Sequence, residues 1–292
     1  MMIKGKVAPK ISGHEKFALR EGWISKGILA VENNPRIFLQ LDAPETFGVG
    51  SNMVKSIRFW LKAFNLIEEK AGTGAELSGF AKRIKKYDFY CQDKFTLWLL
   101  HSHLVKNIKN ATSYYMLFNN MEVDDNTKEQ IEQLLIYELE KYAGGEINKN
   151  TAIDDASVVL QMYSKEKSLA YDPEEKNISP LTSLGLLIQS KGKYSKRQPD
   201  LSKLSEWVIL YELADTFEKI NSNSVSIDAL YNGKSAIGNI YNLTRVALND
   251  YLDRISNMSY IKVDRTAGLD MVYREFTENA DEIIEKYYEG HR

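Results

Sequence analysis

The fold prediction begins with residues 50–78, whose sequence is GSNMVKSIRFWLKAFNLIEEKAGTGAELS. Apolar side chains recur every three or four positions through residues 54–64, and this period predicts an amphipathic helix. Gly50 and Ser51 precede the helix as a loop residue and a candidate N-cap. The apolar face consists of Val54, Ile57, Trp60, Leu61 and Phe64. Trp60 lies in the middle of this face, so we expect it in the hydrophobic core.

The opposite face of the same helix is predicted to bind DNA. It combines cations, an amide and an aromatic ring that we expect to be exposed. Cations suit contacts with phosphates, and amide or aromatic side chains suit contacts with bases. The residues of this face are Asn52, Lys55, Arg58, Phe59 and Lys62. The alternative interpretation is a solvated charged face without a partner.

A β-hairpin is predicted directly after the helix. Residues 66–69 and 75–78 have the pattern of short strands, and Ala71-Gly72-Thr73-Gly74 has that of a turn. A basic run follows, with Lys82, Arg83, Lys85 and Lys86 as further candidate DNA contacts. Helix, hairpin and basic flank in this order predict a winged helix-turn-helix-like unit over residues 1–90. The alternative is a core helix beside an unrelated hairpin.

The charge of the chain is balanced in total but uneven along its length. The 292 residues include 38 Lys and Arg against 40 Asp and Glu, a net charge of −2. Residues 51–86 hold eight basic and three acidic side chains, whereas residues 122–175 hold five basic and fourteen acidic ones. A basic segment can bind a polyanion despite a balanced total. No apolar run approaches the roughly 20 residues of a membrane span, and the single Cys91 suits a reducing compartment, so we expect a cytoplasmic protein without a membrane partner.

The middle of the chain, residues 91–175, is predicted to be a helical and acidic linker domain. The segment FTLWLLHSHLV is apolar nearly all round, which indicates a buried helix. His101 and His103 within it are two positions apart, so they point to different sides of a helix and do not share a metal. Asp154 and Asp155 are candidate Mg²⁺ ligands by residue type, but adjacent acids are more typical of a helix start.

Residues 176–292 are predicted to repeat the plan of the first unit. The helical patterns span residues 204–217, 227–231 and 242–255. Two strand patterns follow, separated by a turn at residues 265–268. Arg245 is a candidate DNA contact, but Asp250 and Asp253 dilute the positive charge, so this unit either binds DNA or forms a protein contact such as a homodimer. The predicted fold class is therefore mainly α (α+β), with two winged helix-turn-helix-like units joined by a helical domain.

Near the N-terminus, residues 23–31 are predicted to form a short helix. Trp23 is expected in the core, and Lys26-Gly27 is expected to end the helix with a glycine C-cap. Phosphate-loop, zinc-ligand and Cys/His nucleophile patterns are absent from the sequence. Sequence patterns alone therefore favour binding over a defined catalytic mechanism.

Three motifs carry a resemblance to a known family. They are GHEKF at residues 13–17, REGWISKG at 20–27 and GVGSNMVKSIRFW at 48–60. Further matching segments are residues 96–101, 118–119 and 181–188. The chain resembles a bacterial DUF family of DNA phosphorothioation and phage-defence gene clusters, which is itself similar to SspB-type DNA-nicking proteins. Ser51 and Phe59 depart from the lysine and tyrosine usual in that family.

The resemblance implies a DNA-binding protein that works with a PAPS-reductase-like sulfur-transfer protein and other modification-system proteins, and that nicks DNA. A nickase needs carboxylates to hold a divalent ion such as Mg²⁺ or Mn²⁺. The candidate catalytic acids, chosen because they lie in the opening motif or beside the basic run, are Glu15, Glu21, Asp88 and Asp93. His14 and Arg20 accompany the first pair, either as a site cluster or as a capping and salt-bridge network. The alternatives are a non-enzymatic transcriptional regulator and a scaffold for the sulfur-transfer partner.

Overall fold

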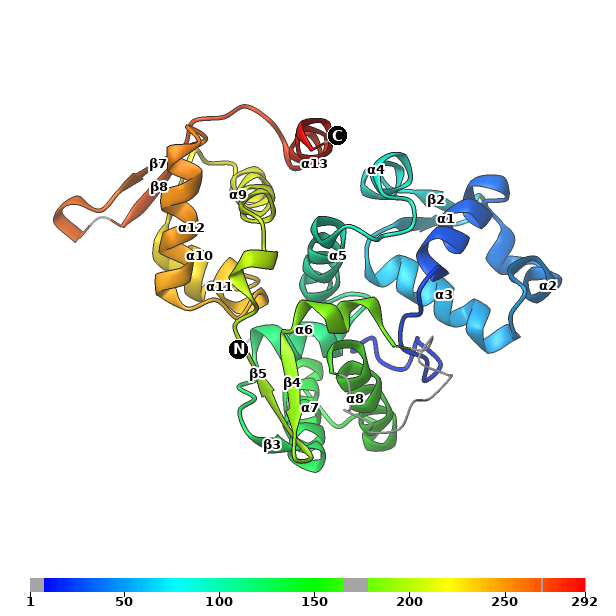
Figure 1. Ribbon diagram of the computed structural model, residues 1–292. Helices are drawn as coiled ribbons and strands as arrows, with labels where there is room; N and C mark the ends of the chain where they lie inside the picture. The colour runs from blue at the N-terminus through cyan, green and yellow to red at the C-terminus, as the bar shows by residue number, and fades with distance from the viewer. Residues whose placement is uncertain (1–7, 165–177, 269, 292) are drawn as a thin grey trace.

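The computed structural model describes residues 8–164, 178–268 and 270–291 of the chain. It is mainly helical with small antiparallel sheets, as predicted (Figure 1). One continuous apolar core runs through the described residues from Leu19 to Tyr288. None of the helices in these ranges is long and apolar enough to cross a membrane.

The N-terminal part is built around one amphipathic helix, α3. Its elements are α1 (Trp23–Asn33), η1 (Ile37–Leu39), α2 (Ala43–Phe47), α3 (Ser51–Ala63), β1 (Ile67–Lys70), β2 (Gly74–Leu77) and α4 (Gly79–Tyr87). The predicted apolar face of α3 is buried, and Trp60 is 1% exposed, so its core position is confirmed. Asn107 donates its side-chain amide to the carbonyls of Lys62 and Ala63, both at 3.0 Å, and so satisfies acceptors that the end of α3 leaves free.

Helix α1 packs against α3 at close range. Trp23 is buried, as predicted. The helix predicted over residues 23–31 is present, but the glycine C-cap predicted at Lys26-Gly27 is wrong, because the helix continues to Asn33. Gly27 serves packing instead: a Cβ at this position would lie 2.6 Å from Cδ1 of Leu61 on α3.

The predicted hairpin is present as β1 and β2, which pair from Ile67 with Leu77 to Lys70 with Gly74. It is tied to the segment after α1, because Ala75 donates its backbone N–H to the carbonyl of Pro35 at 2.7 Å. The hairpin therefore has a fixed position beside α3.

The middle part combines helices with a three-stranded sheet. Its elements are α5 (Lys94–Lys106), α6 (Thr112–Asn119), β3 (Asn126–Thr127), α7 (Lys128–Ala143), α8 (Lys149–Tyr163), η3 (Pro180–Leu184), β4 (Leu187–Ser190) and β5 (Lys193–Lys196). Strand β3 pairs with β5, so the sheet joins residues on the two sides of the boundary that the sequence predicted at 175/176. This pairing links residues more than sixty positions apart in the chain, so no local sequence pattern indicates it.

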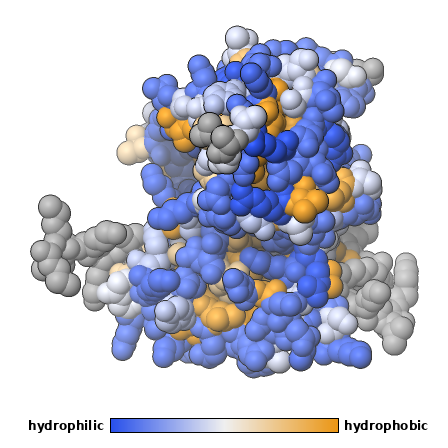
Figure 2. Space-filling model, turned by 90° about the vertical axis from the view of Figure 1, so that its left-hand side faces the viewer, coloured by the Kyte–Doolittle hydropathy of each residue, from blue (hydrophilic) through white to orange (hydrophobic). Residues whose placement is uncertain are grey.

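The C-terminal part has the same sheet order as the middle part. Its elements are η4 (Leu201–Lys203), α9 (Glu206–Ile220), β6 (Ser224–Ser226), α10 (Ile227–Asn232), α11 (Ile237–Ile240), α12 (Arg245–Asn257), β7 (Ile261–Asp264), η5 (Thr266–Gly268), β8 (Met271–Arg274) and α13 (Ala280–Gly290). The orders are β3-β5-β4 and β6-β8-β7, so in both sheets the first strand pairs with the third. Figure 2 shows the side of the molecule that carries this part, where hydrophilic side chains cover most of the surface and apolar ones form small separate patches.

His101 on α5 is a buried hydrogen-bonded core residue. Its Nε2 lies 2.6 Å from the carbonyl of Ile240, which can only accept, so Nε2 carries the proton and Nδ1 accepts from the hydroxyl of Tyr163 at 2.7 Å. His103 bonds elsewhere, to the hydroxyl of Tyr211. The two histidines thus have separate partners, as the helical spacing predicted.

The burial of His101 predicts a pH dependence of stability. Desolvation lowers its pKa to about 3 in the folded state, whereas an unfolded histidine titrates near pH 6.5. Below about pH 6.5 the unfolded chain therefore binds a proton that the folded chain does not, and the free energy of unfolding falls by up to about 1.4 kcal/mol per pH unit from this group. Urea unfolding at pH 7.0 and 5.5 should show a smaller difference for His101→Gln than for the wild type. His291→Gln, at an exposed histidine, should keep the wild-type difference, and an unchanged difference in His101→Gln would contradict the assignment.

Candidate nucleic-acid interface

A cavity of about 300 Å³ lies beside α3 and gathers cations from separate parts of the chain. Its lining residues are Lys10, Gly13, Glu15, Lys55, Arg58, Phe59, Lys62 and Asn110. The predicted cations of α3 are brought together here with Lys10, which the sequence analysis missed. We call this set the basic cavity.

Phe59 forms part of the wall of the basic cavity rather than an exposed contact. The prediction of an exposed ring is wrong, because Phe59 is 7% exposed and meets the rings of His14 and Trp60 edge-on at 5.5 and 4.9 Å. Gly13 lies against it so closely that a Cβ there would be 2.4 Å from Cδ2 of Phe59. The segment that covers the ring is more than forty positions away in the sequence.

The cations of α3 differ in how they are partnered. Arg58 and Lys62 both bond to Glu69 on β1, with distances of 2.5 Å from Arg58 Nε and 2.7 Å from Lys62 Nζ. Lys55 is 62% exposed; its Nζ donates to Asn52 at 3.3 Å and lies 3.9 Å from the carboxylate of Glu15. Partial burial raises the pKa of Glu69, whereas the hydrogen bonds and charges of Arg58 and Lys62 lower it. The lowering effects together outweigh burial, so the pKa of Glu69 lies below its usual range.

The loop of residues 12–16 carries Glu15 to the basic cavity in an unusual backbone conformation. Ser12, Glu15 and Lys16 have positive φ angles of 64°, 49° and 66°. Non-glycine residues rarely adopt such angles unless the surroundings hold them. Here the holding group is Asp155 on α8, whose Oδ1 accepts from the backbone N–H of Ser12 at 2.7 Å.

Asp155 also binds two side chains and is itself 1% exposed. Its Oδ1 lies 2.5 Å from Nε2 of His14, and its Oδ2 accepts from the hydroxyl of Ser113. Nδ1 of His14 accepts from the backbone N–H of Lys16, so Nε2 carries the proton and donates to Asp155. Ser113 bonds to the aspartate and not to the histidine, and the group is closed to solvent, so it is not a hydrolase triad.

The predicted cluster of His14, Glu15 and Arg20 is therefore not formed. His14 belongs to the buried network of Asp155, Glu15 faces the basic cavity, and Arg20 packs against Phe17 and lines a different cavity. The capping and salt-bridge interpretation describes His14 better. The buried aspartate is also no helix-start residue, because α8 begins at Lys149.

We expect Asp155→Asn to destabilise the protein. The substitution keeps the size of the side chain but removes the charge that accepts from Ser12, His14 and Ser113. A hydrogen bond to a charged group contributes about 1.5–3 kcal/mol, and chemical denaturation should show a loss of that size. Asp154→Asn is the control, since Asp154 is 40% exposed and pairs with Lys16 at the surface. Equal losses in the two variants would contradict the role given to Asp155.

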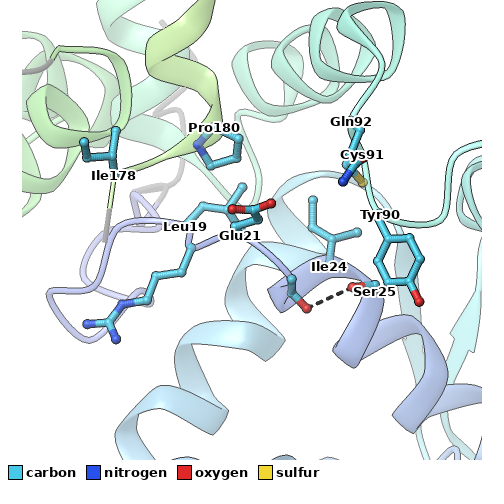
Figure 3. A pocket seen from close by; sticks show the side chains of 11 residues that line it. Leu19, Glu21, Ile24, Ser25, Tyr90, Cys91, Gln92, Ile178 and Pro180 are labelled. Carbon is cyan, nitrogen blue, oxygen red and sulfur yellow. Dashed lines mark hydrogen bonds between the residues drawn. The ribbon is translucent and has the colours of Figure 1, made fainter. Parts of the chain in front are cut away.

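Glu21 lies in a second cavity, of about 200 Å³, at the junction of the N-terminal part with the segments around residues 90–92 and 178–180 (Figure 3). Leu19, Glu21 and Cys91 point into this junction. Burial raises the pKa of the Cys91 thiol, so it stays protonated at neutral pH. Glu15 and Glu21 line different cavities and do not form one site.

Asp88 and Asp93 hold the turn that leads into α5. Asp88 accepts from the backbone N–H groups of Gln92 and Asp93, both at 3.0 Å. Asp93 is the N-cap of α5, accepts from the N–H of Phe95 at 2.8 Å, and also accepts from the hydroxyl of Tyr287. Neither lines the basic cavity. These hydrogen bonds give both acids a structural role.

The basic run on α4 is turned toward the C-terminal helix and α1. Arg83 lies 3.0 Å from Asp281 and 3.1 Å from Glu285 on α13, and Lys85 pairs with Glu32 on α1. Lys86 lies over the ring of Tyr87 at 4.5 Å, and Lys82 is exposed. The structure does not bring these residues into the basic cavity.

Arg245 begins α12 in the C-terminal part and is neutralised there. It lies 3.5 Å from Asp228 and 3.2 Å from Asp270. Two further arginines of this surface are also paired with acids, Arg254 with Glu206 at 2.5 Å and Arg265 with Asp253 at 2.8 Å. Arg245 thus faces two acids, whereas on α3 two cations share the single carboxylate of Glu69, so the charge of this surface favours DNA less than that of α3 does.

Among the described residues no group of three or more His, Cys, Asp and Glu lies together as a metal site. The four predicted catalytic acids are spread over separate cavities and turns. The part of the chain that the structure describes therefore holds no ready-made Mg²⁺ or Mn²⁺ site.

The fold and the cavity together describe a mainly helical protein with small antiparallel sheets and, beside helix α3, a cavity lined by cations. The chain belongs to the family described as "Protein of unknown function (DUF4007)", whose model matches residues 11–288. No curated protein sequence matches it. Two solved structures are similar in fold: an SspB crystal structure with bound magnesium ion, at a TM-score of 0.84, and an SspB crystal structure, at 0.83. Each is 22% identical over 97% of this chain and 87% of the other.

Proposed function

We propose that this protein is a duplex DNA-binding component of a bacterial DNA phosphorothioation or phage-defence system. The observation that carries the proposal is the convergence of Lys10, Lys55, Arg58 and Lys62 on one cavity. Phosphate contacts from lysine and arginine supply most of the affinity of a protein for DNA irrespective of sequence. Membership of the phosphorothioation system is supported by the fold shared with SspB.

We propose further that the N-terminal part acts as a winged helix with α3 as the helix that faces DNA. Helix, turn, helix and hairpin follow one another there as α2, Gly48 to Gly50, α3, and β1 with β2. The C-terminal part has an analogous order, with α12 followed by β7 and β8. Because Arg245, Arg254 and Arg265 of this part each pair with acids of the same part, we assign it to a protein contact: a sulfur-transfer protein of the PAPS-reductase type or a second copy of this chain.

Nicking of DNA is the enzymatic form of this proposal. The magnesium ion in one SspB structure belongs to that protein, and the acids described above do not gather into a metal site within the described residues of this chain. Glu15 is the acid that lines the basic cavity, and one carboxylate can suffice when phosphate oxygens and water complete the Mg²⁺ shell. We derive no chemical step from this arrangement.

The experiment that tests the function uses supercoiled plasmid and a labelled linear duplex. We expect the wild type to bind both in the presence of EDTA. If the protein is a nickase, open-circular plasmid appears only with Mg²⁺ or Mn²⁺, and Glu15→Gln abolishes it while Glu21→Gln, in the other cavity, does not. Binding without nicking under either metal would assign the protein to the regulator or scaffold class. The absence of DNA binding would contradict the proposal.

A further inference from the structure

We propose that Arg58 and Lys62 form a phosphate-binding subsite that the carboxylate of Glu69 occupies in the DNA-free protein. Glu69 thereby lowers the affinity of the basic cavity for DNA until a phosphate displaces it. This inference rests on the proposed DNA-binding function and adds an internal competitor to the same site.

The geometry around Glu69 is that of a bound oxyanion. Arg58 offers two parallel donors, Nε to Oε1 at 2.5 Å and Nη2 to Oε2 at 3.0 Å, and Lys62 donates to Oε2 at 2.7 Å. Arginine recognises carboxylate and phosphate through the same paired donors. A phosphodiester oxygen pair can therefore take the place of the two carboxylate oxygens.

Arg58 and Lys62 lie on α3 where a phosphate from solvent can reach them. The two residues are one helical turn apart, and both line the basic cavity with Lys55 and Lys10. Arg58 and Lys62 are 39% and 32% exposed, so a ligand can reach them from solvent. Glu69, at 21%, is the more covered partner.

A neighbouring cavity can receive the Glu69 side chain when a phosphate displaces it from Arg58 and Lys62. Arg58 and Glu69 also line a neighbouring cavity of about 320 Å³, and Arg36 and Lys70 stand on its wall. A rotation of the Glu69 side chain into this cavity would move its carboxylate from Arg58 and Lys62 towards Arg36 and Lys70. The hairpin need not move, because β1 and β2 stay paired and Ala75 stays bonded to Pro35.

The energetic argument concerns the net charge of the subsite. Two cations and one carboxylate leave a charge of about +1 near the cavity, and removal of the carboxylate leaves about +2, so attraction for a phosphate rises steeply at short range. The side-chain pairs are only partly buried, so water and salt screen them and the exchange is reversible.

The test compares Glu69→Gln with Glu76→Gln. Glu76 lies on the adjacent strand of the same hairpin and pairs with Lys70 at 2.6 Å, so its substitution removes the same charge without freeing Arg58 or Lys62. With a fluorescent duplex in 0.15 M salt, Glu69→Gln should bind about tenfold more tightly than the wild type, because no carboxylate has to be displaced. Its slope of log K against log salt should stay close to that of the wild type, since both proteins make the same phosphate contacts once DNA is bound. Glu76→Gln should stay within about twofold of the wild type. Equal gains in both variants, or weaker binding by Glu69→Gln, would overturn the proposal.

A second measurement separates this proposal from the proposed function. Inorganic phosphate is titrated into ¹⁵N-labelled protein, and the side-chain Nε–H signal of Arg58 is followed. A larger shift at lower phosphate concentration in Glu69→Gln than in the wild type or in Glu76→Gln supports the subsite even if no form of the protein binds DNA, in which case the proposed function alone fails. The same weak response in all three proteins overturns the subsite.

Discussion

Trp60→Ala is expected to lower the free energy of unfolding by roughly 3–5 kcal/mol, the range for removing a fully buried large aromatic side chain. Trp60 is 1% exposed and donates its indole N–H to the carbonyl of Phe17 at 3.2 Å. Its ring stacks on His14 and Phe64 and meets Tyr114 edge-on at 5.7 Å. The substitution therefore leaves a cavity where α3, the opening loop and α6 meet, and an unpaired carbonyl beside it.

Chemical denaturation at pH 7 measures this effect. Leu41→Ala is the control, because Leu41 is fully exposed, and it should change the free energy of unfolding by no more than about 0.5 kcal/mol. A Trp60→Ala protein as stable as the Leu41→Ala protein would mean that the indole is not part of the core.

Simultaneous replacement of Lys55, Arg58 and Lys62 by Ala is expected to weaken duplex binding roughly 30-fold or more near 0.1 M salt, and to reduce the slope of log K against log salt by up to about 2.7. The weakening should be similar for unrelated sequences, since phosphate contacts carry no sequence information. Glu69 loses both of its cationic partners in this variant, so its charge adds repulsion.

A matched triple variant controls for net charge. The control residues are Lys128, Lys141 and Lys149 on the helices α7 and α8 of the middle part. Their replacement by Ala also removes three positive charges from the protein. This control should keep most of the wild-type affinity and slope. Equal losses in the two triple variants would show that total charge, and not the α3 surface, governs binding.

The sequence predicted those features of the fold that depend on near neighbours in the chain. The period of α3 and the strand–turn–strand pattern after it are local, and both elements formed as expected. The pairing of β3 with β5 is not local, and the intervening helices contain no signal for it. For the same reason, a boundary placed at 175/176 from the sequence separates β3 from β5, the strand with which it pairs.

The candidate site shows the same division. The charged face of α3 follows from helical spacing, so Lys55, Arg58 and Lys62 could be named in advance. The position of Lys10 and the covering of Phe59 by Gly13 could not be predicted in this way. Both depend on the path of the N-terminal segment, which is held at Ser12 by the buried Asp155, far away in the sequence. A charged residue within a short strand, such as Glu69, gives no sign of which cations it will meet.

A basic run in the sequence does not by itself identify a DNA-binding surface. A cluster of lysine and arginine is equally suited to DNA and to acids within the same chain. Arg83, Lys85 and Arg245 pair with acids that are distant in sequence, on α13, on α1 and around β8. Only the folded arrangement shows how many acids a cation meets and whether it lines a cavity that a phosphate can enter.

The most direct test of the central claim is lysine footprinting of the wild-type protein with and without duplex DNA. An acylating reagent modifies exposed lysines, and mass spectrometry reports the extent at each position. We predict that DNA protects Lys10, Lys55 and Lys62, which line the basic cavity, while Lys141 and Lys219, on distant helices, react as before. Full reactivity of the three cavity lysines at saturating DNA, with protection found on the C-terminal part instead, would contradict the claim that α3 faces DNA.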